Sequence, residues 1–308
     1  MNDKRNPASS GASNIPMSDI ELEAKVRKVH KRSMIGVAMI VLGAIFAILF
    51  IIPAFFIGVV AGFIVAVVGI IIRKKYADEV KRLISENLVR SALGSVFEDV
   101  QYDAFGHIPD SVVENTNMNF PFDFDEISGS DYVRATYQGL NVEMSDLTLV
   151  NVTTRVDSDG HIHHDRTTVF RGMWLICDFG KELAADLIIS ERTAIGKKLG
   201  LGGVKTENEA FNKQFHIESG DEHTVFYVLT PHMMEYIVQM DAKGAGDTYM
   251  HYTRQGKVHI AINSKRDSFE IGHGKPDVAA LREKFLSEIR YVTDLIDELR
   301  LVDTNPTE

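Results

Sequence analysis

One polar segment gathers the side chains best suited to hold a metal ion. It covers residues 157–165 and reads Asp-Ser-Asp-Gly-His-Ile-His-His-Asp. In an extended chain His161 and His163 share a face, with His164 and Asp165 beside them, and imidazole with carboxylate is a ligand set for transition metals. A hydrophilic hairpin tip turning at its Asp-Gly pair explains the same residues without a metal. We favour the tip and keep these four residues as candidate ligands.

Four other residues could do chemistry only if the fold assembled them. They are three histidines and an aspartate, all suited to proton transfer: His216, His223, His232 and Asp221. A cleft that gathered several of them with shifted pKa values would indicate an enzyme. The motifs of serine hydrolases, cysteine proteases and zincins are absent from the sequence. We therefore predict no catalytic residue and no cofactor, and keep an enzyme as an alternative.

The chain has one cysteine, Cys177, so an intramolecular disulfide is excluded. It ends the apolar run 173–177 and precedes Asp178, whereas a catalytic thiolate needs a basic neighbour. We predict a buried strand residue.

A glycine-rich stretch at 196–203 contains two lysines. It lacks the spacing and the Gly-Lys-Ser/Thr end of a phosphate-binding loop. We predict a mobile loop, with a lipid-headgroup contact as the alternative.

An uncharged apolar run covers residues 34–72. As one helix it would extend about 58 Å at ~1.5 Å per residue, whereas the hydrocarbon core of a bilayer is ~30 Å thick. We therefore predict a transmembrane helical hairpin with spans at about 34–52 and 54–72, broken at Pro53 because proline interrupts a helix. Small residues recur along both spans, which suits packing within the hairpin or a homo-oligomer. We favour packing within the hairpin.

Lysine and arginine flank this run on both sides. Positive residues stay on the cytoplasmic side, so we expect a multi-pass protein of the cell inner membrane with both termini cytoplasmic. The lipid bilayer is then its first partner. The expected organisation is a disordered tail at 1–17, a cytoplasmic helix at 18–33, the hairpin at 34–72, an amphipathic connecting helix at 73–104, and a soluble domain at 105–308.

The net charge of −10 is concentrated beyond residue 104, because the part before it holds more Lys and Arg than Asp and Glu. An acidic domain repels phosphates, which excludes a nucleic-acid partner.

Apolar periodicity in this domain predicts an α+β fold, an antiparallel sheet with flanking helices. Aromatic and acidic residues at 120–126 indicate a linker whose phenylalanines cover the sheet. The predicted strands are 132–137, 141–150, 167–179, 224–229, and a hairpin of 249–254 with 257–263. The predicted helices are 75–103, 206–215 with a capping box, 230–240, and one that begins at 276.

Four stretches together resemble a bacterial membrane-protein family known as domain of unknown function 3137. They are the apolar hairpin with its following helix; residues 128–139 leading to 142–147; Phe170-Arg-Gly through Phe179; and 211–217 followed by Leu229-Thr-Pro231. The sequence departs from the family at Asn212, where an acidic residue is expected, and at Val225-Phe226, where an arginine is expected. The resemblance implies no assigned activity and no catalytic residues, and it suggests a LemA-like membrane protein as a partner.

The anchor, the acidic domain and the lack of catalytic motifs favour a non-enzymatic, membrane-anchored cytoplasmic module that binds a protein or a lipid. The alternatives are an enzyme of unknown reaction and a metal-binding sensor that uses the 157–165 segment.

Overall fold

The computed structural model describes residues 18–49, 56–157, 159–192, 203–244, 246–271 and 277–300. The expected tail at 1–17, the break at Pro53 and nearly all of the glycine-rich stretch lie outside the described residues. The chain divides into two compact units. We call them the helical unit (Met1–Asn87 with Gly274–Ala279) and the sheet unit (Leu88–His273 with Ala280–Glu308).

Two long helices, α1 (Asp19–Leu49) and α2 (Phe56–Ile84), make up the helical unit and run antiparallel. Their backbones approach closely at glycines. A Cβ atom on Gly36 would lie 2.8 Å from the carbonyl oxygen of Gly69, and one on Gly43 would lie 2.6 Å from that of Gly62. The small residues noted in the sequence therefore serve packing between these two helices.

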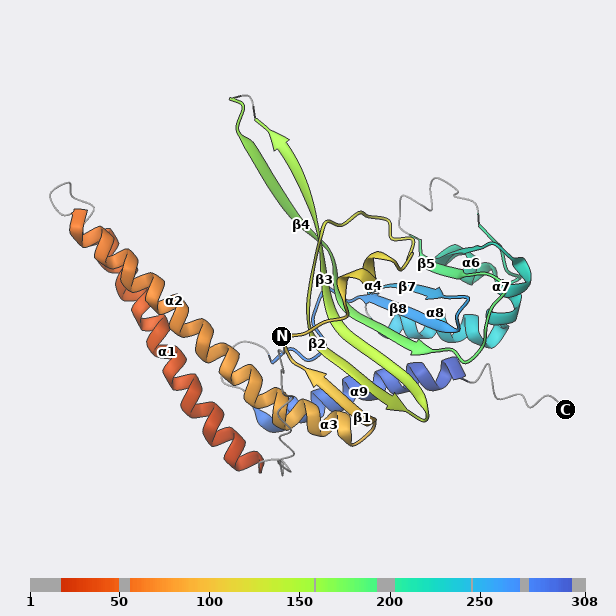
Figure 1. Ribbon diagram of the computed structural model, residues 1–308, viewed down its shortest axis with the longest axis horizontal. Helices are drawn as coiled ribbons and strands as arrows, with labels where there is room; N and C mark the ends of the chain where they lie inside the picture. The colour runs from red at the N-terminus through yellow and green to blue at the C-terminus, as the bar shows by residue number, and fades with distance from the viewer. Residues whose placement is uncertain are drawn as a thin grey trace, which may run out of the picture. The chain divides into compact units, whose positions relative to one another are not determined.

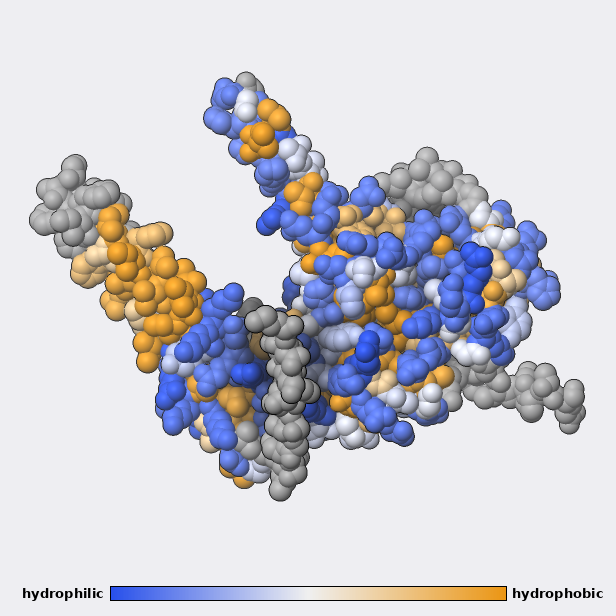
Figure 2. All heavy atoms as spheres, in the orientation of Figure 1, coloured by the Kyte–Doolittle hydropathy of each residue, from blue (hydrophilic) through white to orange (hydrophobic). Residues whose placement is uncertain are grey.

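Within the described residues, one helix is long and apolar enough to cross a membrane, over Asp19–Phe46. It joins the expected cytoplasmic helix and the first span without a break. The second expected span is not identified among the described residues, in which α2 begins only at Phe56. The described residues therefore support one membrane-spanning helix and not a two-span hairpin. Figure 2 shows apolar side chains gathered along part of this helical pair.

Eight strands described in the sheet unit form one antiparallel sheet in the order β1-β2-β3-β4-β8-β7-β5-β6 (Figure 1). This confirms the predicted α+β fold. The strands are β1 (Glu98–Asp103), β2 (Glu126–Tyr137), β3 (Leu140–Val156), β4 (Ile162–Asp178), β5 (Leu187–Glu191), β6 (Phe215–Ser219), β7 (Asp247–Tyr252) and β8 (Lys257–Asn263).

The side chains of each strand alternate between two faces of the sheet. The first, which we call the aromatic face, carries Phe170, Trp174 and Tyr249 and is covered by the 105–125 segment and the short helix α4 (Asp110–Glu114). The ring of Phe120 lies 4.7 Å from that of Tyr249, which confirms that the linker phenylalanines cover the sheet.

We call the second face the helix face, because α9 (Val278–Arg300) lies along it with α8 (Pro231–Gly244) beside α9. The Tyr236 hydroxyl of α8 donates a hydrogen bond to the carbonyl oxygen of Asp294 in α9. The helix predicted from residue 276 is α9, and its apolar stripe is buried, at Leu281, Phe285, Ile289, Val292 and Ile296.

Two sequence predictions were wrong in type. The connecting helix does not reach residue 104, because α2 passes through a π-helical turn (η1, Ser85–Val89) into α3 (Arg90–Gly94) and stops. The Ser95 hydroxyl donates to the carbonyl oxygen of Ala92 at this end, and the next residues pair with β2 as β1. The strand predicted at 224–229 is helix α7 (Glu222–Val228), because Asp221 caps it by accepting from the amide of Thr224.

One helix boundary also differs from the prediction. The cap of α6 (Glu209–Gln214) is Asn208, whose side chain accepts from the amide of Phe211. The predicted cap residue, Thr206, instead donates its hydroxyl to the side-chain oxygen of Asn212.

Strands β3 and β4 extend past their neighbours as a two-stranded ribbon that projects from the rest of the sheet (Figure 1). We call residues 151–167 the arm. In this part the two strands pair only with each other, from Asn151 with Thr167 to Val156 with Ile162. Val156 and Ile162 near the tip are 62% and 64% exposed.

Candidate ligand-binding pocket

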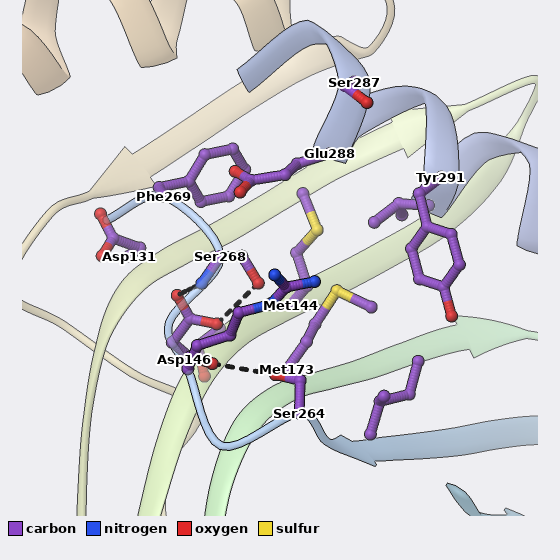
Figure 3. A pocket seen from close by; sticks show the side chains of 14 residues that line it. Asp131, Met144, Asp146, Met173, Ser264, Ser268, Phe269, Ser287, Glu288 and Tyr291 are labelled. Atoms are coloured by element: carbon purple, nitrogen blue, oxygen red, sulfur yellow. Dashed lines mark hydrogen bonds between the residues drawn. The ribbon is translucent and has the colours of Figure 1, made fainter. Parts of the chain in front are cut away.

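A cavity of about 200 Å³ lies between the helix face of the sheet and α9 (Figure 3). Its floor is a row of side chains across three paired strands, in which Asp146 lies opposite Met173 and Met173 opposite Ile262. Glu288 and Tyr291 of α9 form the roof. The segment between β8 and α9 closes one side with Ser264, Arg266, Ser268 and Phe269.

The two-residue repeat of the strands and the helical repeat of α9 explain why these side chains point into the cavity. Met144 and Asp146 are two residues apart in β3, so both point to the helix face. Glu288, Tyr291 and Val292 are three and four residues apart in α9, so they lie on one face of that helix. The cavity therefore depends on the register of the β3–β4–β8 pairing and on the rotation of α9 about its axis.

Asp146 is a buried carboxyl group, 3% exposed, in the cavity floor. Its two oxygens accept hydrogen bonds from the amide and the hydroxyl of Ser268, at 2.7 and 2.9 Å. Burial raises its pKa to about 7, and these bonds only partly oppose that rise. Near neutral pH this carboxyl group exchanges between its charged and neutral forms.

Glu288 faces the floor from α9, and burial also raises its pKa to about 7. The ammonium group of Lys284 lies 3.6 Å from Oε1 and opposes the rise. Oε2 is buried, and no hydrogen-bond donor reaches it among the described residues. The hydroxyl of Tyr291 is likewise buried without a partner in the described part of the chain. Glu288 thus brings a polar atom without a partner among the described residues to the roof of the cavity.

Further charged groups stand around the cavity. Asp131 accepts hydrogen bonds from the hydroxyls of Tyr102 and Ser130, and its charge adds to the rise in the pKa of Asp146. Arg266 is exposed among the lining residues. The guanidinium of nearby Arg171 makes a two-point contact with Asp267, at 2.9 and 2.7 Å. The lining therefore has three carboxyl groups and one guanidinium.

The predicted metal ligands are only partly brought together. Asp157, Asp159 and His161 at the arm tip have potential ligand atoms within 4.8 Å of one another, and Nε2 of His163 lies 2.9 Å from Oδ2 of Asp157. This contact and the amide of His161 lower the pKa of Asp157.

The other two candidate ligands have separate partners. Asp165 pairs with Arg155 at 3.2 Å, and Nδ1 of His164 lies 3.1 Å from the Thr154 hydroxyl. The acid beside the two histidines is thus Asp157, across the turn, and not Asp165.

The suspected catalytic histidines do not meet at the cavity, and none of them lines it. His216 lies 2.7 Å from Oε1 of Glu218 on the same strand, and His232 lies 3.3 Å from Glu298. Asp221 caps α7, and His223 follows in the first turn of that helix. These contacts are local, and they argue against the predicted cluster.

Cys177 is buried in β4 as predicted, and burial raises the pKa of its thiol to about 12. The sequence reading missed Asp146 and Glu288. The sequence did carry one signal for Asp146. This residue lies two positions after Met144 and four after Val142, so an acid stands where the alternation of β3 predicts an apolar side chain.

Comparison with known proteins finds a family model that matches part of the chain, and no activity. Residues 168–301 match the family described as "Protein of unknown function (DUF3137)", which supports the resemblance drawn from the sequence. No curated protein matches the chain. A solved structure, that of the mycobacterial trehalose monomycolate transport factor A, TtfA, is 10% identical over 68% of this chain and 93% of that chain, with a TM-score of 0.33. A likeness this weak bears on neither fold nor function.

Proposed function

We propose that this protein is a membrane-anchored binding module whose sheet unit takes a small ligand into the cavity between β3, β4, β8 and α9. One observation carries the proposal: a cavity that combines apolar side chains with carboxyl groups, including a buried oxygen of Glu288 that has no partner among the described residues. Ligand sites in proteins combine apolar walls with a few converging polar groups in this way.

The anchor belongs to the same proposal. We place both α1 and α2 in the inner membrane as a multi-pass hairpin, with both termini and the sheet unit in the cytoplasm. The close antiparallel packing of the two helices and the basic residues on both flanks of the apolar run support this arrangement.

An enzyme is the second candidate. Asp146 and Glu288 have pKa values near 7, where a carboxyl group serves proton transfer best. The two candidates differ in what happens to the ligand. A binding module releases it unchanged, whereas an enzyme converts it, and mass spectrometry of the released compound separates the two.

The pocket is tested by covering it. Ser287 is an exposed lining residue on α9, so Ser287→Trp places a large side chain over the cavity without disturbing the core. Ser111→Trp, at an exposed position in α4 over the aromatic face, is the matched control. The full-length variants are reconstituted in nanodiscs, incubated with an extract of small molecules, washed, and analysed by mass spectrometry.

We expect the unchanged protein and Ser111→Trp to retain the same compound, and Ser287→Trp to lose at least nine-tenths of it. Equal retention by all three proteins would place the ligand elsewhere. Retention of nothing by any of them would remove the support for a binding module.

A further inference from the structure

We propose that the pocket selects ligands in which a primary ammonium group is joined to a short apolar body. This inference rests on the proposed function and names the chemical class of the ligand. Its basis is the position of Asp146 in the floor, Glu288 in the roof and Asp131 in the same lining (Figure 3).

The charges around the cavity favour a cation. Three of the lining residues are acids and one, Arg266, is a base. Two further positive groups lie near the cavity. Arg171 holds Asp267, and Lys284 donates to the carbonyl oxygen of Glu270 at 2.7 Å while its ammonium group also lies 3.6 Å from Oε1 of Glu288. That contact leaves Oε2 of Glu288 without a partner among the described residues. A ligand carboxylate or phosphate would meet like charge in a partly buried site, which costs free energy.

The acceptors match the donors of an ammonium group, which offers three N–H bonds and no acceptor. Oε2 of Glu288 is buried with no partner among the described residues. Each oxygen of Asp146 accepts a bond from Ser268, and a carboxylate oxygen can accept a second. A neutral hydroxyl has one donor and could satisfy only one of these groups.

The remaining lining suits a short apolar chain. Met144, Met173, Ile262, Phe269 and Val292 line the cavity, and methionine side chains adapt to ligands of different shape. An engineered cavity of ~150 Å³ in another protein binds benzene, which has six heavy atoms, so a cavity of about 200 Å³ suits a ligand of roughly seven heavy atoms. Hexylamine has that size.

The proposal predicts that the affinity of the pocket for an alkylamine depends on pH. Burial raises the pKa values of Asp146 and Glu288 to about 7, so both are largely protonated at pH 5.5 and largely ionised at pH 8. An alkylamine stays protonated across this range. Because the ionised carboxyl groups bind it better, its affinity should rise at least tenfold from pH 5.5 to pH 8.

The experiment is isothermal titration calorimetry of the full-length protein in phosphatidylglycerol nanodiscs with hexylamine, 1-hexanol and hexanoate. We expect hexylamine to bind at least tenfold more tightly than the other two at pH 8, with the rise in affinity just described. Glu288→Gln should weaken hexylamine at least tenfold and leave 1-hexanol unchanged. Asp165→Asn, which removes an exposed acid on the arm, should change neither.

The outcomes separate this inference from the proposed function. If 1-hexanol and hexanoate bind as tightly as hexylamine and Ser287→Trp abolishes all three, the pocket binds ligands but the ammonium assignment is wrong. If none of the three binds, both proposals fail.

A second set of nanodiscs that contain phosphatidylethanolamine identifies the source of the ammonium group. A lower apparent affinity for hexylamine in these discs means that the lipid headgroup competes for the site. An unchanged affinity means that the natural ligand is a free amine.

Discussion

Asp146 is a carboxyl group that the fold withdraws from water and holds with two hydrogen bonds from one serine. Its pKa is about 7 in the folded protein and near 3.8 in an unfolded chain. The folded state therefore binds the proton more tightly, and this stabilisation is present below pH 3.8 and lost as the pH rises through 7. The loss can reach about 4 kcal/mol at ~1.36 kcal/mol per pKa unit.

Asp146→Asn removes this titration. We expect the free energy of unfolding of the variant, relative to the unchanged protein, to rise between pH 4 and pH 8 by up to about 4 kcal/mol. The measurement is urea unfolding of the full-length protein at several pH values. Asp165→Asn is the control, and it should show no such slope. Parallel profiles for Asp146→Asn and the unchanged protein would mean that folding does not raise the pKa of Asp146.

His259 behaves in the opposite sense on the aromatic face. It is 7% exposed and its ring lies 6.4 Å from that of Trp174. Burial lowers its pKa to about 4, and the positive charge of nearby His251 adds to the effect. A neutral His259 stabilises the fold above pH 6.5, and this contribution is lost as the pH falls towards 4.

We expect the His259→Phe variant to lose less free energy of unfolding in acid than the unchanged protein. Between pH 6.5 and pH 4 the unchanged protein should lose about 3 kcal/mol more than the variant, from the same conversion of pKa into free energy. Urea unfolding across this range measures the difference. The exposed His164→Phe on the arm is the control, and an equal acid loss in both variants would contradict the assignment.

At the level of elements, the arm is a ribbon that belongs to the sheet but covers none of its core. Its residues from Thr153 to Arg166 are mostly exposed, including two apolar side chains near the tip. Surface residues of this kind contribute little to stability, within ~0.5 kcal/mol each.

Shortening the arm tests this. Replacing residues 155–163 by a two-residue turn should leave the thermal midpoint of the full-length protein within a few degrees of its original value, and hexylamine binding unchanged. Scanning calorimetry and the titration above measure both. A large fall in the midpoint would show that the tip stabilises the fold.

Sequence patterns predicted those elements whose local and long-range signals agree. The hairpin of β7 and β8 and the helix that begins at Pro231 were found because alternation, turn residues and proline placement coincide there. The same sequence patterns gave the wrong element at β1 and α7. The apolar stripe that leads into β1 reads as more helix until pairing with β2 decides, and the β-branched residues of α7 hid the cap at Asp221.

The pocket was beyond sequence reasoning for a different reason. Asp146 is visible as a polar residue in an apolar pattern, but Glu288 lies 142 positions away, and only the packing of α9 on the sheet brings them together. The number of membrane spans was predicted from the length of the apolar run, whereas the described residues contain one helix that is long and apolar enough to cross a membrane.

At the scale of the whole molecule, the proposed placement of both units can be tested by cysteine labelling. Cys177 is buried and its raised pKa keeps the thiol unreactive, so the unchanged protein is a blank background. Ser18→Cys reports on the start of α1, and Ser111→Cys on the sheet unit.

We expect a membrane-impermeant maleimide to label both variants only after the cells are opened, because both positions are cytoplasmic in the proposed hairpin. Labelling of Ser111→Cys in intact cells would place the sheet unit outside. Labelling of only one of the two variants in intact cells would require an odd number of spans.

The pairing of β4 with β8 has a consequence for synthesis of the chain. Strands β1 to β4 pair with sequence neighbours and can form as soon as they leave the ribosome, but the free edge of β4 waits for a strand about 80 residues later. Contacts so distant in sequence close slowly. Because α9 follows β8, the cavity is completed only when α9 has been made, and a nascent chain that lacks α9 cannot enclose it.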